Sequence, residues 1–250
     1  MLKQEDPNHL ITYHPSGRTQ SSTWFHDEPW LDFNMFQSGL RRCCQGDTLD
    51  AKGEDNWRYI NEDCAKLPPK PTLDGEPSYE TIPQGLHDPK QPYWTGKECR
   101  RYAYWSVFEG SASHAYGNNA VIQMHKPDSG PGAYRVRNYW HEAIDEPRAG
   151  QMQYLKRLIL SRPHLERVPE QDLIAGKNGV RENIVTTSGR PYLLAYRYTA
   201  VASKFSWGLF PNNRHMRGGT ILVTVLPGRW RFPQQGHSRI DTTRFADAGK

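Results

Sequence analysis

Glu76 is the residue around which the chemistry of this sequence can be organised. It stands in the run Lys70–Glu80, directly between Gly75 and Pro77. Glycine allows a sharp backbone turn, and proline lacks the backbone N–H that strand pairing needs. We therefore expect Glu76 at the end of a strand, where a carboxylate can act as a nucleophile or as a general acid or base. A surface turn with an exposed acid has the same local sequence, so the surrounding elements must decide between the two.

Polar side chains also follow the other predicted strands. Short apolar or alternating runs bounded by turn residues predict strands over 9–14, 30–39, 72–73 and 112–116. In a parallel α/β barrel the carboxyl ends of the strands meet on one face, and the chemistry lies there. The side chains at or just after these ends, besides Glu76, are His14, Gln37, Ser38, His114, Tyr116 and Asn119.

Three helices are predicted, over residues 55–67, 95–108 and 150–161. The first carries an apolar stripe from Trp57 to Leu67 at spacings of three, four and three. The second begins with a threonine cap and ends before a glycine, and the third carries an apolar stripe that ends before a proline. The alternation of strands and helices predicts an α/β fold of the parallel barrel type.

The predicted barrel is incomplete, and a different architecture follows it. Four strands leave two open edges, whereas a closed barrel of this type has eight. Residues 186–198 and 220–226 have the pattern of β hairpins. We therefore predict part of a (β/α)8 TIM barrel over residues 1–168 and a small β-rich C-terminal domain over 169–250, atypical after about residue 205.

Charge and composition argue against several classes of function. After Ala200 the chain has eight basic and two acidic side chains, so this tail accounts for more than the whole formal charge of +5. No nucleic-acid-binding motif accompanies that charge, and we predict no nucleic-acid partner. The chain has no apolar run of the roughly 18 residues that a membrane span needs, and Met1–Asn8 lacks the apolar centre of a signal peptide.

The cysteines and the short motifs predict neither a metal site nor a cofactor. Cys43, Cys44, Cys64 and Cys99 form no C-x-x-C pair, and four free thiols are the simplest interpretation. A zinc protease is set aside because Asp145 stands where the second histidine of H-E-x-x-H belongs.

Four long segments of the chain resemble the apiosidase-like glycoside hydrolases. They occur in the expected order and cover roughly residues 8–198: HLITYHPSGRTQSSTWFHDEPWLDFNMFQSG, NWRYINEDCAKLPPKPTLDGEPSYE, RRYAYWSVFEGSASHAYGNNAVIQM and AGQMQYLKRLILSRP. The resemblance implies a bacterial (β/α)8-barrel enzyme followed by part of a β domain named after the collagen-binding domain of a collagenase. It also implies a periplasmic or secreted protein that releases apiose from the plant cell-wall pectin rhamnogalacturonan II.

The same resemblance assigns Glu76 as the nucleophile of a retaining glycosidase, at the end of the seventh barrel strand. The strands found here then correspond to the fifth to eighth, and the acid/base carboxylate belongs to the fourth strand, before Met1. On this interpretation the chain is the carboxyl-terminal half of the enzyme, and the missing half is a candidate partner. Resemblance and strand-end placement together predict the sugar contacts. Trp24 and Phe25 are expected to stack on a sugar ring. The residues expected to hydrogen-bond its hydroxyl groups are His14, Gln37, His114, Tyr116 and Asn119.

Two other interpretations stay open. A retaining glycosidase needs two carboxyl groups roughly 5–5.5 Å apart, and the further acids near strand ends, Asp27, Glu28 and Asp32, are weak candidates for the second. Without one, the chain is a non-catalytic carbohydrate-binding or remnant protein. The third interpretation is an interaction protein that uses its β-rich part.

Overall fold

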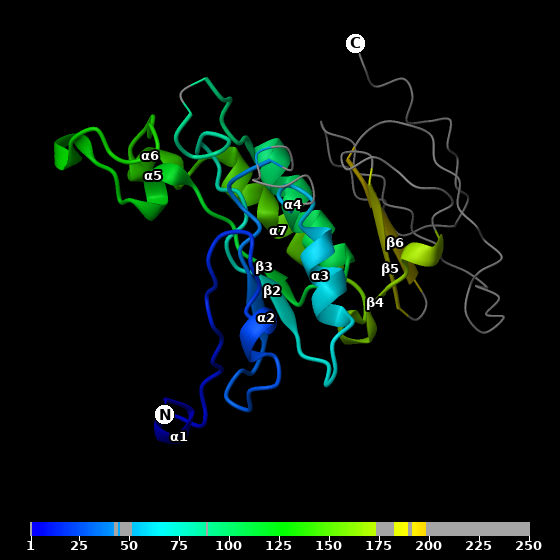
Figure 1. The fold of residues 1–250 in the computed structure, drawn as a ribbon. Helices are drawn as coiled ribbons and strands as arrows, with labels where there is room; N and C mark the ends of the chain where they lie inside the picture. Colours follow the sequence, from blue (N-terminus) through cyan, green and yellow to red (C-terminus); the bar gives the residue numbers. More distant parts are fainter. Residues whose placement is uncertain are drawn as a thin grey trace, which may run out of the picture. The chain divides into compact units, whose positions relative to one another are not determined.

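The computed structural model describes residues 2–42, 45, 52–88, 90–173, 183–189 and 192–198. The chain divides into two compact units, Met1–Ser161 and Arg162–Lys250. Figure 1 shows helices packed along a parallel sheet in the first unit and antiparallel strands in the second. No helix in the described ranges is long and apolar enough to cross a membrane.

The first unit is built on a parallel sheet with the strand order β1-β2-β3. These strands are β1 (Asn34–Phe36), β2 (Thr72–Asp74) and β3 (Ser113–His114). Phe36 is aligned with Asp74, and Asp74 with His114, so the carboxyl ends of the three strands lie level. This confirms the α/β class for the first unit.

A long helix follows each strand of this sheet. The helices are α3 (Trp57–Cys64), α4 (Gly96–Phe108) and α7 (Pro147–Leu160), and α4 packs against both α3 and α7. Two shorter helices, α1 (Leu2–Glu5) and α2 (Ser22–Phe25), precede β1, and two more, α5 (Asn119–Ile122) and α6 (Trp140–Ala143), lie between β3 and α7. All three helices predicted from the sequence are therefore present.

Helix α4 shows how local sequence signals set an element. Thr95 caps its amino end by accepting a hydrogen bond from Lys97 N, and Glu98 accepts one from Thr95 N, which together form a capping box. At the other end Gly110 has a φ of 117°, a conformation that favours glycine. The buried cation of this helix, Arg101, is paired with Glu54 at 2.9 Å.

The predicted apolar stripe of α3 is confirmed at Ile60 but is wrong at Cys64 and Leu67. The residues that α3 buries are Tyr59, Ile60 and Asp63, whereas Cys64 is exposed and Leu67, beyond the helix end, is 80% exposed. Tyr59 stacks on Phe36 of β1, with the ring centroids 5.0 Å apart. Asp63 is buried because Gln20, Ser22 and Thr72 all donate hydrogen bonds to it.

The predicted strand over 9–14 is also wrong, so the described part of the sheet has three strands. This segment runs beside the residues before β1, where Asp32 N donates to Ile11 O at 2.9 Å. Ile11 N, however, donates to the side-chain carboxylate of Asp32 at 2.7 Å and not to a backbone carbonyl. A side chain has taken the place of a backbone carbonyl, and the ladder does not form.

A buried carboxyl group beside α4 predicts how the stability of the first unit depends on pH. Burial raises the pKa of Glu109 to about 7, against an ordinary value of 4.5, and a hydrogen bond from Asn61 lowers it only in part. Below pH 4.5 the group is protonated in the folded and unfolded states alike. Between pH 4.5 and 7 the unfolded state ionises first, so the free energy of unfolding falls by about 3 kcal/mol as the pH rises.

We expect Glu109→Gln to remove this fall. Urea denaturation followed by tryptophan fluorescence at pH 5 and pH 8 would measure it, because Trp94 and Trp105 are buried in this unit. Glu142→Gln is the matched control at an exposed glutamate. Equal pH dependence in the wild type and Glu109→Gln would contradict the assignment.

The second unit contains an antiparallel sheet with the order β4-β5-β6. Its strands are β4 (Val168–Pro169), β5 (Ile184–Gly189) and β6 (Tyr192–Arg197). The pairing of Ile184 with Arg197 and of Gly189 with Tyr192 confirms the hairpin predicted over 186–198. The hairpin predicted over 220–226 and the atypical tail after about residue 205 lie outside the described residues.

Candidate functional site

Glu76 lies just beyond the carboxyl end of β2, in the position predicted for it. Its carbonyl accepts a hydrogen bond from Gly39 N at 2.9 Å, so the segments that follow β1 and β2 stay paired. A Cβ atom at Gly39 would lie 2.4 Å from the backbone of Pro77. Glycine is therefore required at this close approach, which holds the segment after β1 against the one that carries Glu76.

Both carboxylate oxygens of Glu76 are held by side chains. Gln37 Nε2 donates to Glu76 Oε1 at 2.6 Å, and His14 Nε2 lies 3.0 Å from Oε2. The Glu76 side chain is 23% exposed and the His14 side chain 49% exposed. The result is an oriented carboxylate that remains accessible to a ligand.

Both ring nitrogens of His14 lie beside an acceptor atom. Its Nδ1 lies 3.0 Å from the carbonyl oxygen of Pro15, and its Nε2 faces a carboxylate. These two contacts orient the ring against Glu76.

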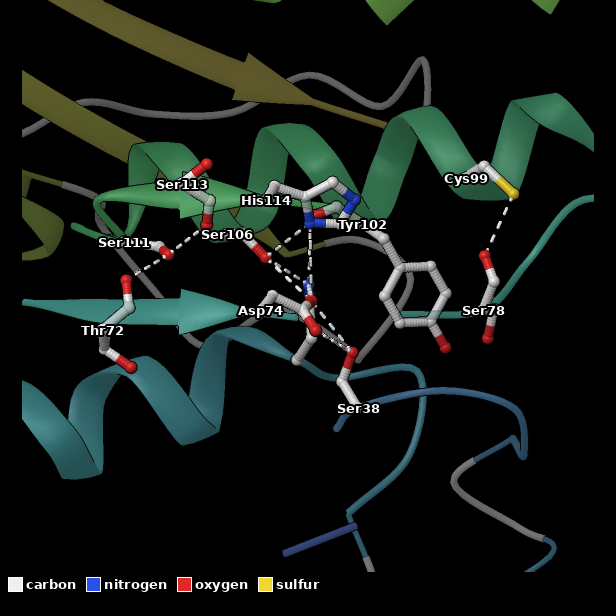
Figure 2. A network of polar contacts seen from close by, with 11 residues as sticks. Ser38, Thr72, Asp74, Ser78, Cys99, Tyr102, Ser106, Ser111, Ser113 and His114 are labelled. Carbon is white, nitrogen blue, oxygen red and sulfur yellow. Dashed lines mark hydrogen bonds and ion pairs between the residues drawn. The ribbon is translucent and has the colours of Figure 1, made fainter. Parts of the chain in front are cut away.

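Beneath this site lies a buried polar network centred on Asp74 (Figure 2). Asp74 is completely buried and accepts hydrogen bonds from Ser38, Asn56 and Ser106 at 2.9–3.0 Å. These donors come from the segment after β1, from the residue before α3 and from α4. The network therefore fixes both neighbouring helices to β2, the strand that Glu76 follows.

His114 belongs to the network rather than to the contacts of Glu76. Its Nδ1 lies 3.5 Å from Asp74 Oδ2 and 3.3 Å from Ser106 Oγ, and its side chain is 5% exposed (Figure 2). Because His114 is level with Asp74 in the sheet, both side chains point to the helix face. No contact of the described residues joins it to Glu76.

Tyr116 and Asn119 lie in the segment after β3 and bind the segment after β2. Tyr116 Oη donates to Glu80 Oε2 at 2.7 Å, and burial together with this bond raises the pKa of Tyr116. Asn119 Nδ2 donates to the carbonyls of Thr81 and Tyr134 at 3.0 Å, and its side chain is completely buried. Tyr116 and Asn119 therefore connect the loop after β3 to the loop after β2.

Tyr79 is the remaining ionisable residue close to Glu76 in the chain. Burial, with the negative charges of Glu76 and Asp74, raises the pKa of Tyr79 to about 12. Gly117 provides the space for it, since a Cβ atom there would lie 2.3 Å from the Tyr79 ring. Tyr79 is thus a neutral, packed phenol at neutral pH.

Trp24 and Phe25 lie at the opposite end of the sheet from Glu76. Both belong to α2, whose Ser22 binds Asp63, and Asp63 in turn binds Thr72 at the amino end of β2. The Phe25 ring contacts Tyr13, Trp24 and Trp30, while Trp24 is 55% exposed. The structure therefore does not bring these two aromatics to the carboxylate, and their stacking role stays a prediction without support from placement.

Among the described residues, no contact brings a second carboxylate to Glu76. Asp32 is paired with Lys3 at 2.8 Å, and this bond, with one from Ile11 N, lowers the pKa of Asp32. Asp27 and Glu28 are exposed. Nor do three or more His, Cys, Asp or Glu side chains cluster as a metal site would require within these ranges.

The comparisons with known proteins place these observations in a family. The family described as "Apiosidase-like, catalytic domain" matches residues 1–166. No curated protein matches the chain significantly.

Two solved structures are similar to this chain. One, described as a glycoside hydrolase, is 51% identical with a TM-score of 0.72, over 77% of this chain and 44% of that chain. The other is described as a glycoside hydrolase family 5 from Bacteroides vulgatus ATCC 8482, and it is 49% identical with a TM-score of 0.74, over 79% of this chain and 43% of that chain. The chain thus spans less than half the length of both solved chains. Because the family match covers more than half of the present sequence, the chain belongs to the apiosidase-like catalytic-domain family.

Proposed function

We propose that this chain takes part in the hydrolysis of glycosidic bonds, with Glu76 as the nucleophile of a retaining mechanism. The observation that carries the proposal is the Glu76 carboxylate, which lies at the carboxyl end of a parallel strand and is held at both oxygens while remaining partly exposed. One oxygen attacks the anomeric carbon as the bond to the leaving oxygen breaks, and a glycosyl ester forms. Water then cleaves the ester and regenerates the carboxylate.

We further propose that the acid/base carboxylate comes from outside these 250 residues. The similar solved chains are more than twice as long as the portions aligned with this one. The first unit, extended to residue 168, would then supply the fifth to eighth strands of a (β/α)8 barrel, with residues 169–250 as a separate β-rich domain. Family membership supports an apiose-containing glycan of plant pectin, such as rhamnogalacturonan II, as the substrate, and a periplasmic or secreted location.

A substrate with an activated leaving group tests the nucleophile without the missing acid. Dinitrophenolate leaves without a proton, so a dinitrophenyl apioside needs only Glu76 for the first step. We expect a burst of up to one equivalent of dinitrophenolate per chain, followed by slow or no turnover. On rhamnogalacturonan II fragments we expect no release of apiose by the chain alone. Full turnover of those fragments by this chain would contradict the proposed origin of the acid/base group.

Gln37 and His14 are proposed to hold the nucleophile in its reactive orientation. We expect Gln37→Leu to slow the burst about 10²-fold, because misplacement of a reacting group by about 1 Å has an effect of that size. Stopped-flow measurement of dinitrophenolate release checks this, with Gln153→Leu as a control at an exposed glutamine. An unchanged burst rate in Gln37→Leu would remove Gln37 from the site.

The alternative, a non-catalytic carbohydrate-binding or remnant protein, is favoured by one observation. In the described part of the chain, no contact brings a second carboxylate to Glu76. Saturable binding of the apioside with no burst would support this alternative.

A further inference from the structure

Tyr79 lies in the loop that leaves the carboxyl end of β2, three residues after the proposed nucleophile. The backbone on each side of it is anchored. Ser78 O accepts a hydrogen bond from Cys99 Sγ at 3.2 Å, and Glu80 N donates to Gly117 O at 2.9 Å. Cys99 belongs to α4, and Gly117 to the loop after β3. The loop that carries Tyr79 is therefore fixed to two other elements.

The Tyr79 ring is held by close packing. A Cβ atom at Gly117 would lie 2.3 Å from Cδ1 of the ring, so the ring lies directly against the backbone of the loop after β3. The ring also packs against a cluster of buried side chains, namely Leu40, Ile82, Trp94 and Tyr102. Since both its backbone and its ring are fixed, the Tyr79 hydroxyl has a defined position.

The Tyr79 hydroxyl faces the negative charges at the end of β2. Burial and, after it, the charges of Glu76 and Asp74 raise the pKa of Tyr79 to about 12. The interaction between charges weakens with distance, so the phenol oxygen lies toward these two carboxylates. Glu80 is the next residue in the chain, but its carboxylate accepts a hydrogen bond from Tyr116 instead. Tyr79 therefore presents a protonated hydroxyl to the strand end at neutral pH.

This hydroxyl has no hydrogen-bond partner within the part of the chain that the structure describes, although Tyr79 is half-buried. Other tyrosines on these loops are bonded to the protein, since Tyr116 Oη donates to Glu80 at 2.7 Å and Tyr93 Oη donates to a backbone carbonyl at 3.0 Å. A tyrosine hydroxyl in such surroundings usually has a partner. A fixed and protonated donor beside Glu76 is thus available to a ligand.

We propose that Tyr79 is a substrate-binding residue whose hydroxyl donates a hydrogen bond to the 2-hydroxyl of the sugar that Glu76 attacks. The 2-hydroxyl is on the carbon beside the anomeric carbon, so it is the sugar hydroxyl nearest to the point of attack. Hydrogen bonds to this group strengthen in the transition state of glycoside hydrolysis. The inference rests on the proposed function, since it takes Glu76 as the nucleophile. It makes Tyr79 a determinant of specificity, because a site built to bind a hydroxyl rejects an analogue that lacks it.

Binding of methyl apioside and of its 2-deoxy analogue tests this contact without any chemical step, because methoxide is a poor leaving group. Tyr79→Phe removes only the phenol oxygen and keeps the packed ring. By titration calorimetry we expect Tyr79→Phe to weaken binding of methyl apioside about 10-fold and to leave binding of the 2-deoxy analogue unchanged. Tyr154→Phe makes the same change at a half-buried tyrosine of α7, and it should bind both glycosides as the wild type does.

The urea midpoint of Tyr79→Phe should equal that of the wild type, because the hydroxyl bonds to no described residue. A lower midpoint, with equal loss of affinity for both glycosides, would indicate a role in the fold and overturn the contact. Loss for neither glycoside would also overturn it, as would the absence of saturable binding of methyl apioside by the wild type.

The binding experiment and the burst experiment separate the two proposals. Selective loss of methyl apioside binding in Tyr79→Phe, without a burst in the wild type, would support the contact but not the nucleophile. A burst in the wild type without this selective loss would support only the nucleophile.

Discussion

Glu76→Gln is expected to abolish the burst of dinitrophenolate from an activated apioside, with a loss of rate on the order of 10⁴-fold or more. Glutamine has nearly the same shape, but its neutral amide oxygen is a poor nucleophile. Its amide group would also face the side chains of Gln37 and His14, which now hold the two carboxylate oxygens. Stopped-flow absorbance under single-turnover conditions measures the rate.

The control for this substitution is Glu28→Gln, which makes the same chemical change at an exposed acid. It should leave the burst unchanged. Circular dichroism of both variants would establish that the fold is retained. If the folded Glu76→Gln variant gave a burst of wild-type rate, the assignment of the nucleophile would be wrong.

Asp74→Ala is expected to have the largest effect on stability, a decrease of about 3–5 kcal/mol in the free energy of unfolding. The substitution leaves the donors on Ser38, Asn56 and Ser106 without their shared acceptor in a fully buried position. It also opens a small cavity between the sheet and the helices. Urea denaturation followed by tryptophan fluorescence would measure the change.

Two further variants make the Asp74 experiment specific. Asp74→Asn keeps the volume but turns an amide donor toward other donors, so we expect an intermediate loss of about 1–3 kcal/mol. Ser113→Ala changes an exposed side chain on the neighbouring strand and should stay within about 0.5 kcal/mol of the wild type. A loss below about 1 kcal/mol for Asp74→Ala would mean that the network contributes little to the fold.

The elements predictable from the sequence are those with local signals. Thr95 and Glu98 form the predicted start of α4, and the glycine after its end has the expected conformation. The segment 9–14 failed as a strand because its pairing depends on a distant side chain: Asp32 takes the N–H of Ile11. Nothing in the local sequence of residues 9–14 indicates that bond.

The same distinction applies to the candidate site. Gln37 and His14 were predicted near Glu76 because strand ends gather on one face, and the structure brings both to its carboxylate although residues 9–14 form no strand. The Asp74 network was not predicted, since its donors lie 18–36 residues away in sequence. A signal existed in Asp74 itself, a charged residue within a short strand that packs beneath helices.

Trp24 and Phe25 show a further limit of reasoning from residue type. Aromatic residues near a predicted sugar site suggest stacking, but the location of Trp24 and Phe25 is set by the bond from Ser22 to Asp63 at the amino end of the sheet. Asn119 is the converse case, because a residue assigned to a sugar hydroxyl instead donates to the backbone carbonyls of Thr81 and Tyr134 and so joins two loops.

The most direct test of the central claim is to identify the residue that carries the glycosyl group after the burst. The chain, mixed with the dinitrophenyl apioside and quenched in acid, would be digested and analysed by mass spectrometry. The account predicts one added apiosyl group on the peptide that contains Glu76, and no added mass in the Glu76→Gln variant. A glycosyl group on another carboxylate, or a burst that leaves no glycosylated peptide, would contradict it.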